Sequence, residues 1–354
     1  MYGDITVQEA IKLPTAIFID LRSPHEYGQG SIPGSVNIPL FNDQEREIIG
    51  LQYKEDRHHA RMTGLNLVSP KLPEIMEKII RLGYNRIPVV YCWRGGLRSK
   101  SVYNLLETVG IPAYRLPGGY KAYRRFILDQ LTAYELKKPL FVLNGLTGTG
   151  KTEILRLLMA RDCPGIDLED LARHRGSLFG HIGFREKRCQ KDFDALLWNR
   201  LEELQSAPYL LLEGEGKRIG SVYLPAFLFQ SIQEGAHILL TAPLEKRVER
   251  LLKEYTPSIQ DEIEEIEGAI QSLKKYLGAK TVAHFLLLLE QENYPELIRL
   301  LCERYYDRLY SESQPEKTGG FALAVDSSNP EKAAAEIMQF VQQALATQNI
   351  QPRA

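Results

Sequence analysis

The feature that most constrains this chain is a glycine-rich segment, GLTGTGKT, at residues 145–152. It matches the pattern GxxxxGK followed by Ser or Thr, and it lies between four apolar residues at 140–143 and a predicted helix at about 152–160. Glycines let the backbone wrap closely around a phosphate, the lysine neutralises its charge, and the threonine hydroxyl can hold Mg²⁺. The predicted ligands of a di- or triphosphate are Gly145, Thr147, Gly148, Thr149, Gly150, Lys151 and Thr152.

Two glutamates follow the next strand predicted in this half of the chain. The strand covers residues 209–212 and leads into Glu213 and Glu215. In phosphate-loop enzymes an aspartate at the end of another strand helps to hold Mg²⁺, and glutamate can replace it. Both residues are therefore candidate ligands of Mg²⁺ or of substrate. The departure from aspartate leaves ATP hydrolysis open, and in the alternative interpretation the two glutamates only cap a strand at the solvent edge.

Basic residues gather around the same motifs. Arg173 and Arg175 follow the phosphate loop, a basic run covers residues 185–188, and Arg218 follows the two glutamates. They are candidates to contact a diphosphate or an RNA backbone, whereas the alternative is a solvated charged surface. The net charge of −1 provides no general basic field, so an RNA partner would depend on such local clusters.

A second candidate functional loop lies at residues 91–99. Its sequence is YCWRGGLRS, and it follows a predicted buried strand. The N–H groups of such a loop converge on one point, and the helix that follows adds partial positive charge, so an anion can bind. Arg94 and Arg98 supply donors suited to tetrahedral oxyanions. The same field favours a thiolate, which makes Cys92 the predicted nucleophile. The alternative is a structural cysteine at the end of a strand.

Apolar runs alternate with amphipathic stretches along the chain, which indicates parallel sheets covered by helices. We predict an α/β domain at residues 1–132 and a doubly wound α/β domain at 138–350, with a helical subdomain at about 258–312. The predicted elements outside the two loops are strands at 16–21, 88–92, 237–240 and 321–325 and helices at 70–82, 101–110 and 330–345.

The cysteines and the hydropathy of the chain indicate where in the cell the protein is expected. The four cysteines form no CxxC pair, so neither a disulfide framework nor a zinc centre is predicted. The N-terminus has no apolar signal-peptide core, and the longest apolar stretch, near residues 284–289, is too short to span a bilayer. We therefore expect a cytoplasmic protein with no membrane partner.

Three motifs in the N-terminal half resemble the rhodanese family. They are DLRSPHEY at 20–27, GSIPGSVNIP at 30–39 and LPGGY at 116–120, with the cysteine loop between the second and the third. The resemblance implies sulfur or selenium transfer, or an inert descendant of such a domain. Five residues separate Cys92 from Arg98, one more than in many single-domain rhodaneses and similar to the dual-specificity phosphatases. We infer a cradle wide enough for phosphate or a phosphate-bearing donor.

The whole chain resembles the tRNA 2-selenouridine synthase family. The resemblance rests on the two loops and on LARHRGSLFG at 171–180 and EGEGKRIG at 213–220. It implies a transferase that modifies 2-thiouridine at the tRNA wobble position, first by S-geranylation from geranyl diphosphate and then by selenation from selenophosphate. It further implies that the phosphate loop takes the prenyl diphosphate, with Mg²⁺ as a candidate cofactor. Cys92 would take selenium as a perselenide or position it, with Arg94 and Arg98 on the phosphate, and a selenophosphate-supplying enzyme is a candidate partner.

Two other classes of function remain open from the sequence. The C-terminal half also resembles small-molecule kinases, so the chain could be an ATP-dependent kinase or ATPase with a regulatory rhodanese-like domain. A non-catalytic tRNA-binding module is the third interpretation. The cysteine between two arginines argues against it, because an inert domain could have lost the thiol.

Overall fold

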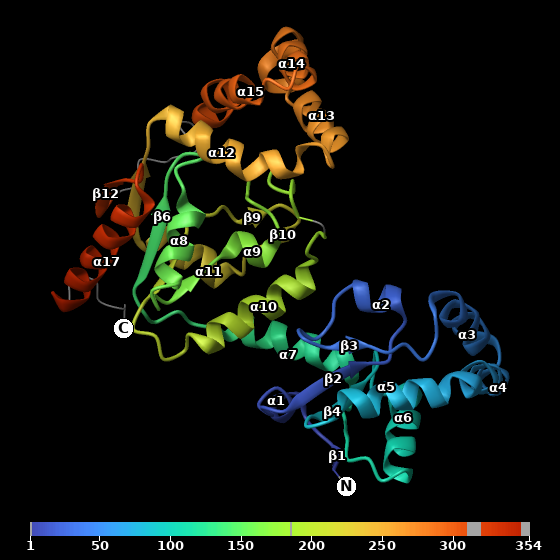
Figure 1. Cartoon of the computed structure of the whole chain (residues 1–354). Helices are drawn as coiled ribbons and strands as arrows, with labels where there is room; N and C mark the ends of the chain where they lie inside the picture. The colour runs from blue at the N-terminus through green and yellow to red at the C-terminus, as the bar shows by residue number, and fades with distance from the viewer. Residues whose placement is uncertain (1, 185, 310–319, 348–354) are drawn as a thin grey trace. The chain divides into compact units, whose positions relative to one another are not determined.

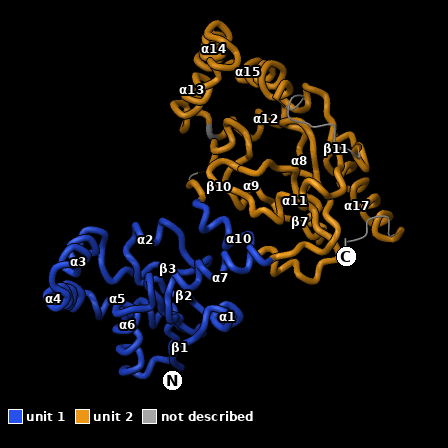
Figure 2. The backbone as a smooth tube through the Cα atoms, turned by 180° about the vertical axis from the view of Figure 1, so that it is seen from behind, with its two compact units in different colours: residues 1–133, 189–199 blue, residues 134–188, 200–354 orange. Residues whose placement is uncertain are grey.

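The computed structural model describes residues 2–184, 186–309 and 320–347. The chain forms two compact units (Figure 2). Unit 1 contains residues 1–133 and 189–199, and unit 2 contains residues 134–188 and 200–354. The division expected from the sequence did not assign residues 189–199 to the N-terminal half. Residues 190–199 form the first part of a helix whose remainder belongs to unit 2.

Unit 1 is built on a parallel sheet in the order β1-β5-β4-β2-β3 (Figure 1). Its strands are β1 (Gly3–Asp4), β2 (Ala16–Asp20), β3 (Val36–Asn37), β4 (Ile87–Tyr91) and β5 (Tyr114–Arg115). Its helices are α1 (Val7–Ala10), α2 (Pro24–Gly28), α3 (Asp43–Glu55), α4 (Arg57–Val68), the short η1 (Ser69–Lys71), α5 (Leu72–Leu82), α6 (Leu97–Thr108) and α7 (Gly119–Ala133). The central strand β4 is buried from Pro88 to Tyr91, as expected for a parallel strand covered on both faces.

Unit 2 contains a second parallel sheet, in the order β12-β11-β6-β8-β7, and a small hairpin of β9 and β10. Its strands are β6 (Leu140–Asn144), β7 (Gly165–Ile166), β8 (Leu210–Glu213), β9 (Arg218–Ile219), β10 (Val222–Tyr223), β11 (Ala236–Thr241) and β12 (Leu323–Asp326). Its helices outside the helical subdomain are α8 (Lys151–Met159), α9 (Leu168–Ala172), the end of α10 (Gln190–Glu203), α11 (Ala226–Glu234) and α17 (Pro330–Ala346). The predicted α/β class with parallel sheets in both halves is confirmed.

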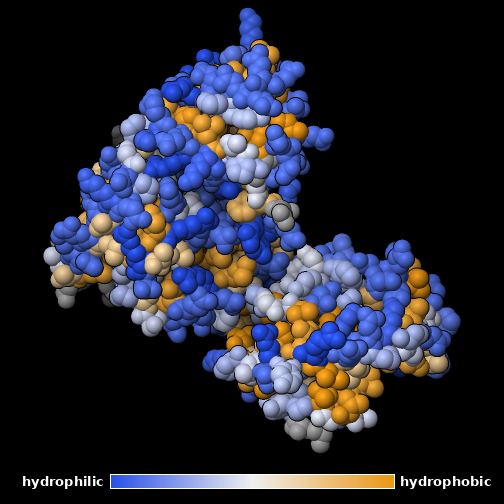
Figure 3. Space-filling view, viewed as in Figure 1, coloured by the Kyte–Doolittle hydropathy of each residue, from blue (hydrophilic) through white to orange (hydrophobic). Residues whose placement is uncertain are grey.

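Consecutive helices follow β11, and they begin at Leu244, before the start of the subdomain predicted at about 258–312. They are α12 (Leu244–Ile259), α13 (Ile263–Ser272), α14 (Lys274–Glu290), α15 (Tyr294–Leu301) and the π-helical turn η2 (Cys302–Tyr306). Their apolar faces pack into a core of their own, which includes Ile270, Leu273 and Phe285. The surface over α14 is mostly hydrophilic (Figure 3), as amphipathic helices require. Residues 310–312 of the predicted subdomain lie outside the described residues.

Two elements differ from their predicted bounds in ways that matter for the sites. The helix predicted at 101–110 begins at Leu97, directly after Gly96, so the cysteine loop is short and runs straight into a helix N-terminus. The strand predicted at 321–325 begins at Leu323 and ends at Asp326. No helix in the described part of the chain combines the length and hydropathy needed to cross a membrane.

Candidate functional site

The phosphate loop connects β6 to α8 and has a backbone that only glycine adopts easily. Gly148 has a φ of 82° and Gly150 a φ of 85°. A Cβ added at Gly148 would lie 3.0 Å from the carbonyl oxygen of Arg247, so a side chain there would meet both strain and backbone. At Gly145 a Cβ would lie 2.5 Å from Thr149 Oγ1. The loop is therefore held tightly around the space in front of the N-terminus of α8.

Two arginines of α12 and a serine donate hydrogen bonds to carbonyl oxygens of this loop. Arg247 Nε donates to the carbonyl oxygen of Thr147 at 2.8 Å, while its terminal nitrogens form a bidentate ion pair with Asp307 at 2.6 and 3.0 Å. Arg250 Nη1 and Ser327 Oγ both donate to the carbonyl oxygen of Thr149, at 3.2 and 2.7 Å. The sequence placed these arginines on a helix but did not identify them as supports of the loop.

The predicted loop ligands have different environments. Lys151 Nζ lies 3.1 Å from the carbonyl oxygen of Gly145, across the loop. Thr152 Oγ1 donates to Glu169 Oε2 at 2.9 Å. Thr149 is 1% exposed and donates its hydroxyl to the carbonyl oxygen of Leu146 at 2.8 Å. Lys151 and Thr152 can thus offer side chains to a ligand, whereas the Thr149 side chain holds the loop together.

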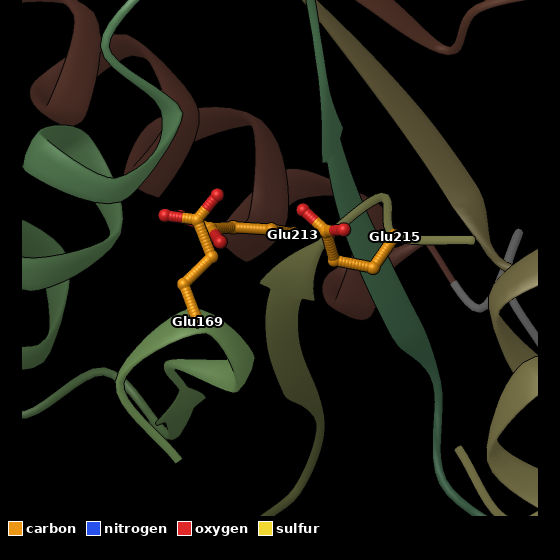
Figure 4. A group of neighbouring side chains, drawn as sticks. All are labelled: Glu169, Glu213 and Glu215. Atoms are coloured by element: carbon orange, nitrogen blue, oxygen red, sulfur yellow. The ribbon is translucent and has the colours of Figure 1, made fainter. Parts of the chain in front are cut away.

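Three glutamates lie beside Thr152 with their carboxylates facing a common space (Figure 4). Glu213 ends β8, Glu215 follows it, and Glu169 comes from α9, with ligand oxygens that all lie within 4.8 Å of one another. Sequence analysis missed Glu169, because the two-residue strand β7 that positions α9 has no detectable periodicity. Glu213 is fully buried, and neither of its carboxylate oxygens has a hydrogen-bond partner among the described residues.

Burial and mutual repulsion oppose ionisation of this cluster. Burial, followed by the charges of Glu169 and Glu215, raises the pKa of Glu213 well above its usual range. Burial and the charge of Glu169 raise the pKa of Glu215 to about 7, against the lowering effect of Lys151. A divalent cation would remove the repulsion and supply the missing partner of Glu213.

The cluster fits Mg²⁺ by the chemistry of its donors. Mg²⁺ prefers an octahedron of oxygens at about 2.1 Å, in which ligand oxygens lie about 3 to 4 Å apart. The glutamate oxygens, within 4.8 Å of one another, come near this spacing, and the Thr152 hydroxyl is adjacent. Mg²⁺ also keeps several non-protein ligands, which the oxygens of a diphosphate can provide.

We expect Glu215→Gln to stabilise the metal-free protein at neutral pH but not at pH 4.5. The folded-state pKa of Glu215 is raised from 4.5 to about 7, so the stability linked to its neutral form is present below pH 4.5 and is lost as pH rises towards 7. Removing this penalty should stabilise the fold by on the order of 2 kcal/mol at pH 8, or about 5 °C in melting temperature. Melting curves in EDTA from pH 4.5 to 8 measure it.

The exposed Glu267→Gln on α13 is the matched control and should show no such difference. Excess Mg²⁺ should reverse the order of stability, because it should bind more tightly to the protein that keeps all three glutamates. Equal melting temperatures of Glu215→Gln and the parent at every pH would contradict the account of the cluster.

A pocket of about 990 Å³ opens beside the loop. It is lined by Lys151, Thr152, Glu215, Arg173 and Arg175.

The three arginines predicted to contact the ligand have different partners in the structure. Arg173 forms an ion pair with Asp170 at 3.4 Å and is otherwise exposed. Arg175 pairs with Glu254, and its guanidinium lies 4.7 Å from the centroid of the Phe184 ring, so it supports the pocket wall. Arg218 lies outside the pocket, on β9, with Nε donating to the carbonyl oxygen of Gly220 at 2.6 Å.

An apolar cavity of about 60 Å³ adjoins this pocket. The two share Thr147 of the phosphate loop, together with Leu251, Tyr255 and Tyr306. Side chains of the helical subdomain, among them Ile270, form most of the remaining lining, and Phe179 and Ile182 come from the segment between α9 and α10. The sequence could not indicate this cavity, because its walls come from segments that meet only in the folded protein.

In unit 1 the cysteine loop lies between β4 and α6, and α7 anchors it. The first N–H groups of α7, those of Tyr120 and Lys121, donate to the carbonyl oxygens of Cys92 and Trp93 at 2.9 and 3.0 Å. A Cβ at Gly119 would lie 2.0 Å from the carbonyl oxygen of Cys92, so this close approach requires glycine. The N–H groups of residues 94–97 make no backbone hydrogen bond to any residue that the structure describes, and they remain available to an anion.

Cys92, the predicted nucleophile, is buried directly after β4. It is 3% exposed, and its Sγ is 3.4 Å from Ser99 Oγ. The hydroxyl of Ser99 donates to the carbonyl oxygen of Gly96 at 3.3 Å, and it would have to turn from that oxygen to donate to a thiolate at Cys92. Little of Cys92 is open to solvent.

The two arginines of this loop have different partners. Arg98 forms a bidentate ion pair with Glu26, at 2.6 and 3.2 Å, and Glu26 also completes a capping box with Ser23 at the start of α2. Burial raises the pKa of Glu26, but the hydrogen bonds and charge of Arg98 outweigh it and lower that pKa. Arg94 is exposed and has no hydrogen bond or ion pair with a described residue, so it is the arginine open to an incoming anion. Arg115, which the sequence analysis missed, donates to the carbonyl oxygen of Gly95 at 3.0 Å.

Comparison with known proteins matches both halves of the chain. The family model described as the tRNA 2-selenouridine synthase AAA domain matches residues 138–347, and the rhodanese-like domain model matches residues 6–126. A tRNA 2-selenouridine synthase of Sulfurovum sp. (strain NBC37-1) is 34% identical over 85% of this chain and 89% of its own length. That of Hydrogenovibrio crunogenus is 35% identical over 87% of this chain and 92% of its own. A solved N-terminal domain of a protein titled ATP/GTP binding, from Clostridium difficile 630, is 42% identical over 35% of this chain and 98% of its own, with a TM-score of 0.35.

Proposed function

Because the chain belongs to the tRNA 2-selenouridine synthase family, we propose that it replaces the sulfur of 2-thiouridine by selenium at the wobble position of tRNA. The proposed route is S-geranylation by geranyl diphosphate in unit 2, followed by selenation from selenophosphate in unit 1. The observation that carries it is the pairing of a phosphate loop and a carboxylate cluster with an adjoining apolar cavity. A cytoplasmic location and delivery by a selenophosphate-supplying enzyme are parts of the same proposal.

The first step needs a stabilised diphosphate leaving group. The sulfur of 2-thiouridine attacks C1 of the geranyl chain, the C–O bond breaks, and pyrophosphate leaves with the bonding electron pair. Lys151 and the N–H groups of the loop neutralise the charge that develops on the departing oxygen. Mg²⁺ held by Glu169, Glu213 and Glu215 would add further neutralisation of the diphosphate.

The apolar cavity supports a hydrocarbon-bearing diphosphate over a nucleotide. Thr147 belongs both to the phosphate loop and to the cavity wall, so a chain attached to a bound diphosphate has an apolar surface within reach. The cavity is small, at about 60 Å³, and we therefore place only the end of the chain in it and the remainder in the larger pocket.

The second step needs selenium at C2 of the alkylated base. Cys92 could not form a perselenide from selenophosphate without an oxidant, because selenium in this donor is already fully reduced. A balanced role is attack of the Cys92 thiolate on phosphorus, which forms an S–P bond and releases selenide. Selenide then attacks C2 and expels geranylthiolate, while water hydrolyses the phosphocysteine. The free N–H groups of the loop and exposed Arg94 would hold the phosphate, and Ser99 would donate to the thiolate.

The test is to incubate the pure protein with 2-thiouridine tRNA, geranyl diphosphate, selenophosphate and Mg²⁺ and to analyse nucleosides by mass spectrometry. We expect S-geranyl-2-thiouridine as an intermediate and 2-selenouridine as the product. Selenouridine formed at full rate without geranyl diphosphate would eliminate the alkylation step.

The alternative is an ATP-dependent kinase or ATPase with a regulatory rhodanese-like domain, since the same loop and carboxylates could hold ATP. It requires ATP turnover by the pure protein that is insensitive to Cys92→Ala. The apolar wall at Thr147 favours the prenyl donor over this alternative.

A further inference from the structure

Four tyrosines of the helical subdomain lie in or near the phosphate pocket. Tyr255 and Tyr306 also line the apolar cavity, whereas Tyr276 and Tyr305 have no part in the proposed chemistry. Tyr305 and Tyr306, in the π-helical turn η2, and Tyr255 of α12 line the pocket itself. Tyr276, at the start of α14, is 68% exposed, and its ring centroid lies 6.0 Å from that of Tyr305. Tyr305 in turn lies 5.1 Å from Tyr306. The rings thus form a continuous series from solvent to the pocket wall.

We propose that Tyr276 and Tyr305 form a stacking platform that receives unpaired bases of the RNA substrate and directs one of them into the pocket. This inference rests on the proposed function, because it takes single-stranded RNA as the occupant. A base whose sulfur attacks a bound diphosphate ester must come within bonding distance of the pocket ligand, so it has to leave its stack. Aromatic side chains are the usual partners of such splayed bases, since every base has a face to stack.

The charges beside Tyr276 are complementary to a nucleic acid backbone. Lys274, Lys275 and Lys280 are all exposed and lie within four residues of Tyr276 on α14. The surface over α14 is mostly hydrophilic in Figure 3, which argues against an apolar protein partner there. Lys253 lines the pocket and extends the basic groups to its wall. Basic side chains beside aromatic rings are the combination by which proteins bind single-stranded nucleic acids.

The tyrosine rings lie next to two irregular turns of the backbone, one at Gly278 and one at Cys302–Tyr306. Gly278 has φ 78° and ψ 163° inside α14, so the turn that carries Tyr276 is set at an angle to the rest of the helix. The π-helical turn at Cys302–Tyr306 offsets Tyr305 and Tyr306 from ordinary α-helical positions. Such turns are rare and occur frequently at functional sites.

The experiment measures binding of the full-length protein to a fluorescent anticodon stem-loop RNA by anisotropy, without any donor. Tyr276→Ala should weaken binding roughly 5- to 100-fold, the range expected for the loss of one stacked base. Tyr276→Phe keeps the ring and should bind within about twofold of the parent. The matched control is Tyr84→Ala, which removes a tyrosine of unit 1 that is 80% exposed.

A second experiment uses a stem-loop RNA that has abasic sites in its anticodon loop. The parent should bind it as weakly as Tyr276→Ala binds intact RNA, and the variant should lose nothing further. Replacing Lys274 and Lys275 by Gln should reduce the slope of log K against log salt by about 1.4. Equal binding by Tyr276→Ala and the parent, or equal losses for Ala and Phe, would overturn the platform.

The outcomes also separate this inference from the proposed function. If the parent makes selenouridine but Tyr276→Ala binds RNA normally, the platform is wrong and the function stands. If binding depends on the ring but no selenouridine forms, the surface binds RNA and the proposed chemistry is wrong.

Discussion

Replacing Lys151 with alanine is expected to lower the rate of S-geranylation by roughly 10²- to 10³-fold, the usual effect of removing one donor to a developing negative charge. Lys151 lies at the N-terminus of α8, with Nζ reaching across the loop to the carbonyl oxygen of Gly145. Its charge is needed most as the C–O bond breaks, so the rate of the chemical step should fall more than the affinity for geranyl diphosphate. Single-turnover formation of the S-geranyl nucleoside measures it.

Lys246→Ala is the control for this prediction. Lys246 is an exposed lysine of α12 that pairs with Glu249 at 2.8 Å and does not line the pocket, so its loss should leave the rate unchanged. Lys151→Arg tests whether charge alone suffices, because its longer planar group should recover only part of the rate in so tight a loop. Normal geranylation by Lys151→Ala would show that the phosphate loop serves another ligand.

The sequence predicted the parts of both sites that are local in the chain. The phosphate loop was recognisable because strand, glycines, lysine and helix follow one another within 20 residues. Glu213 and Glu215 were recognisable because they directly follow the apolar run that forms β8. Glu169 was not, because its place beside Thr152 depends on how β7 and α9 pack against β8.

Long-range pairings account for the remaining differences. The partner of Arg98 is Glu26, 72 residues away, and no pattern in the cysteine loop indicates that pair. Likewise, residues 189–199 lie deep in the sequence of the C-terminal half, yet Asp194 pairs with Arg124 of α7 at 2.6 Å. The apolar cavity depends on how α12 to α15 fold together, so hydropathy alone could indicate helices but not the space between them.

Replacing Cys92 with serine should abolish selenation, by roughly 10³-fold or more as for other lost nucleophiles, and S-geranyl tRNA should accumulate. Serine keeps the size of the side chain and a hydrogen bond to Ser99, so the loop should fold normally. Its hydroxyl is far less nucleophilic than a thiolate and should not displace selenide from phosphorus. Nucleoside mass spectrometry follows both products, and the parent quenched in base should yield phosphocysteine at Cys92.

Cys189→Ser is the matched control, since Cys189 is the half-exposed cysteine of the chain and lies outside the loop, 3.3 Å from Asp192 Oδ2. It should form selenouridine at the parent rate. Arg94→Ala should raise the selenophosphate concentration needed for half-maximal rate, because this exposed arginine has no competing carboxylate of the kind that occupies Arg98. If Cys92→Ser forms selenouridine as fast as the parent, selenium reaches the base without this thiol, and the loop acts only as a phosphate cradle.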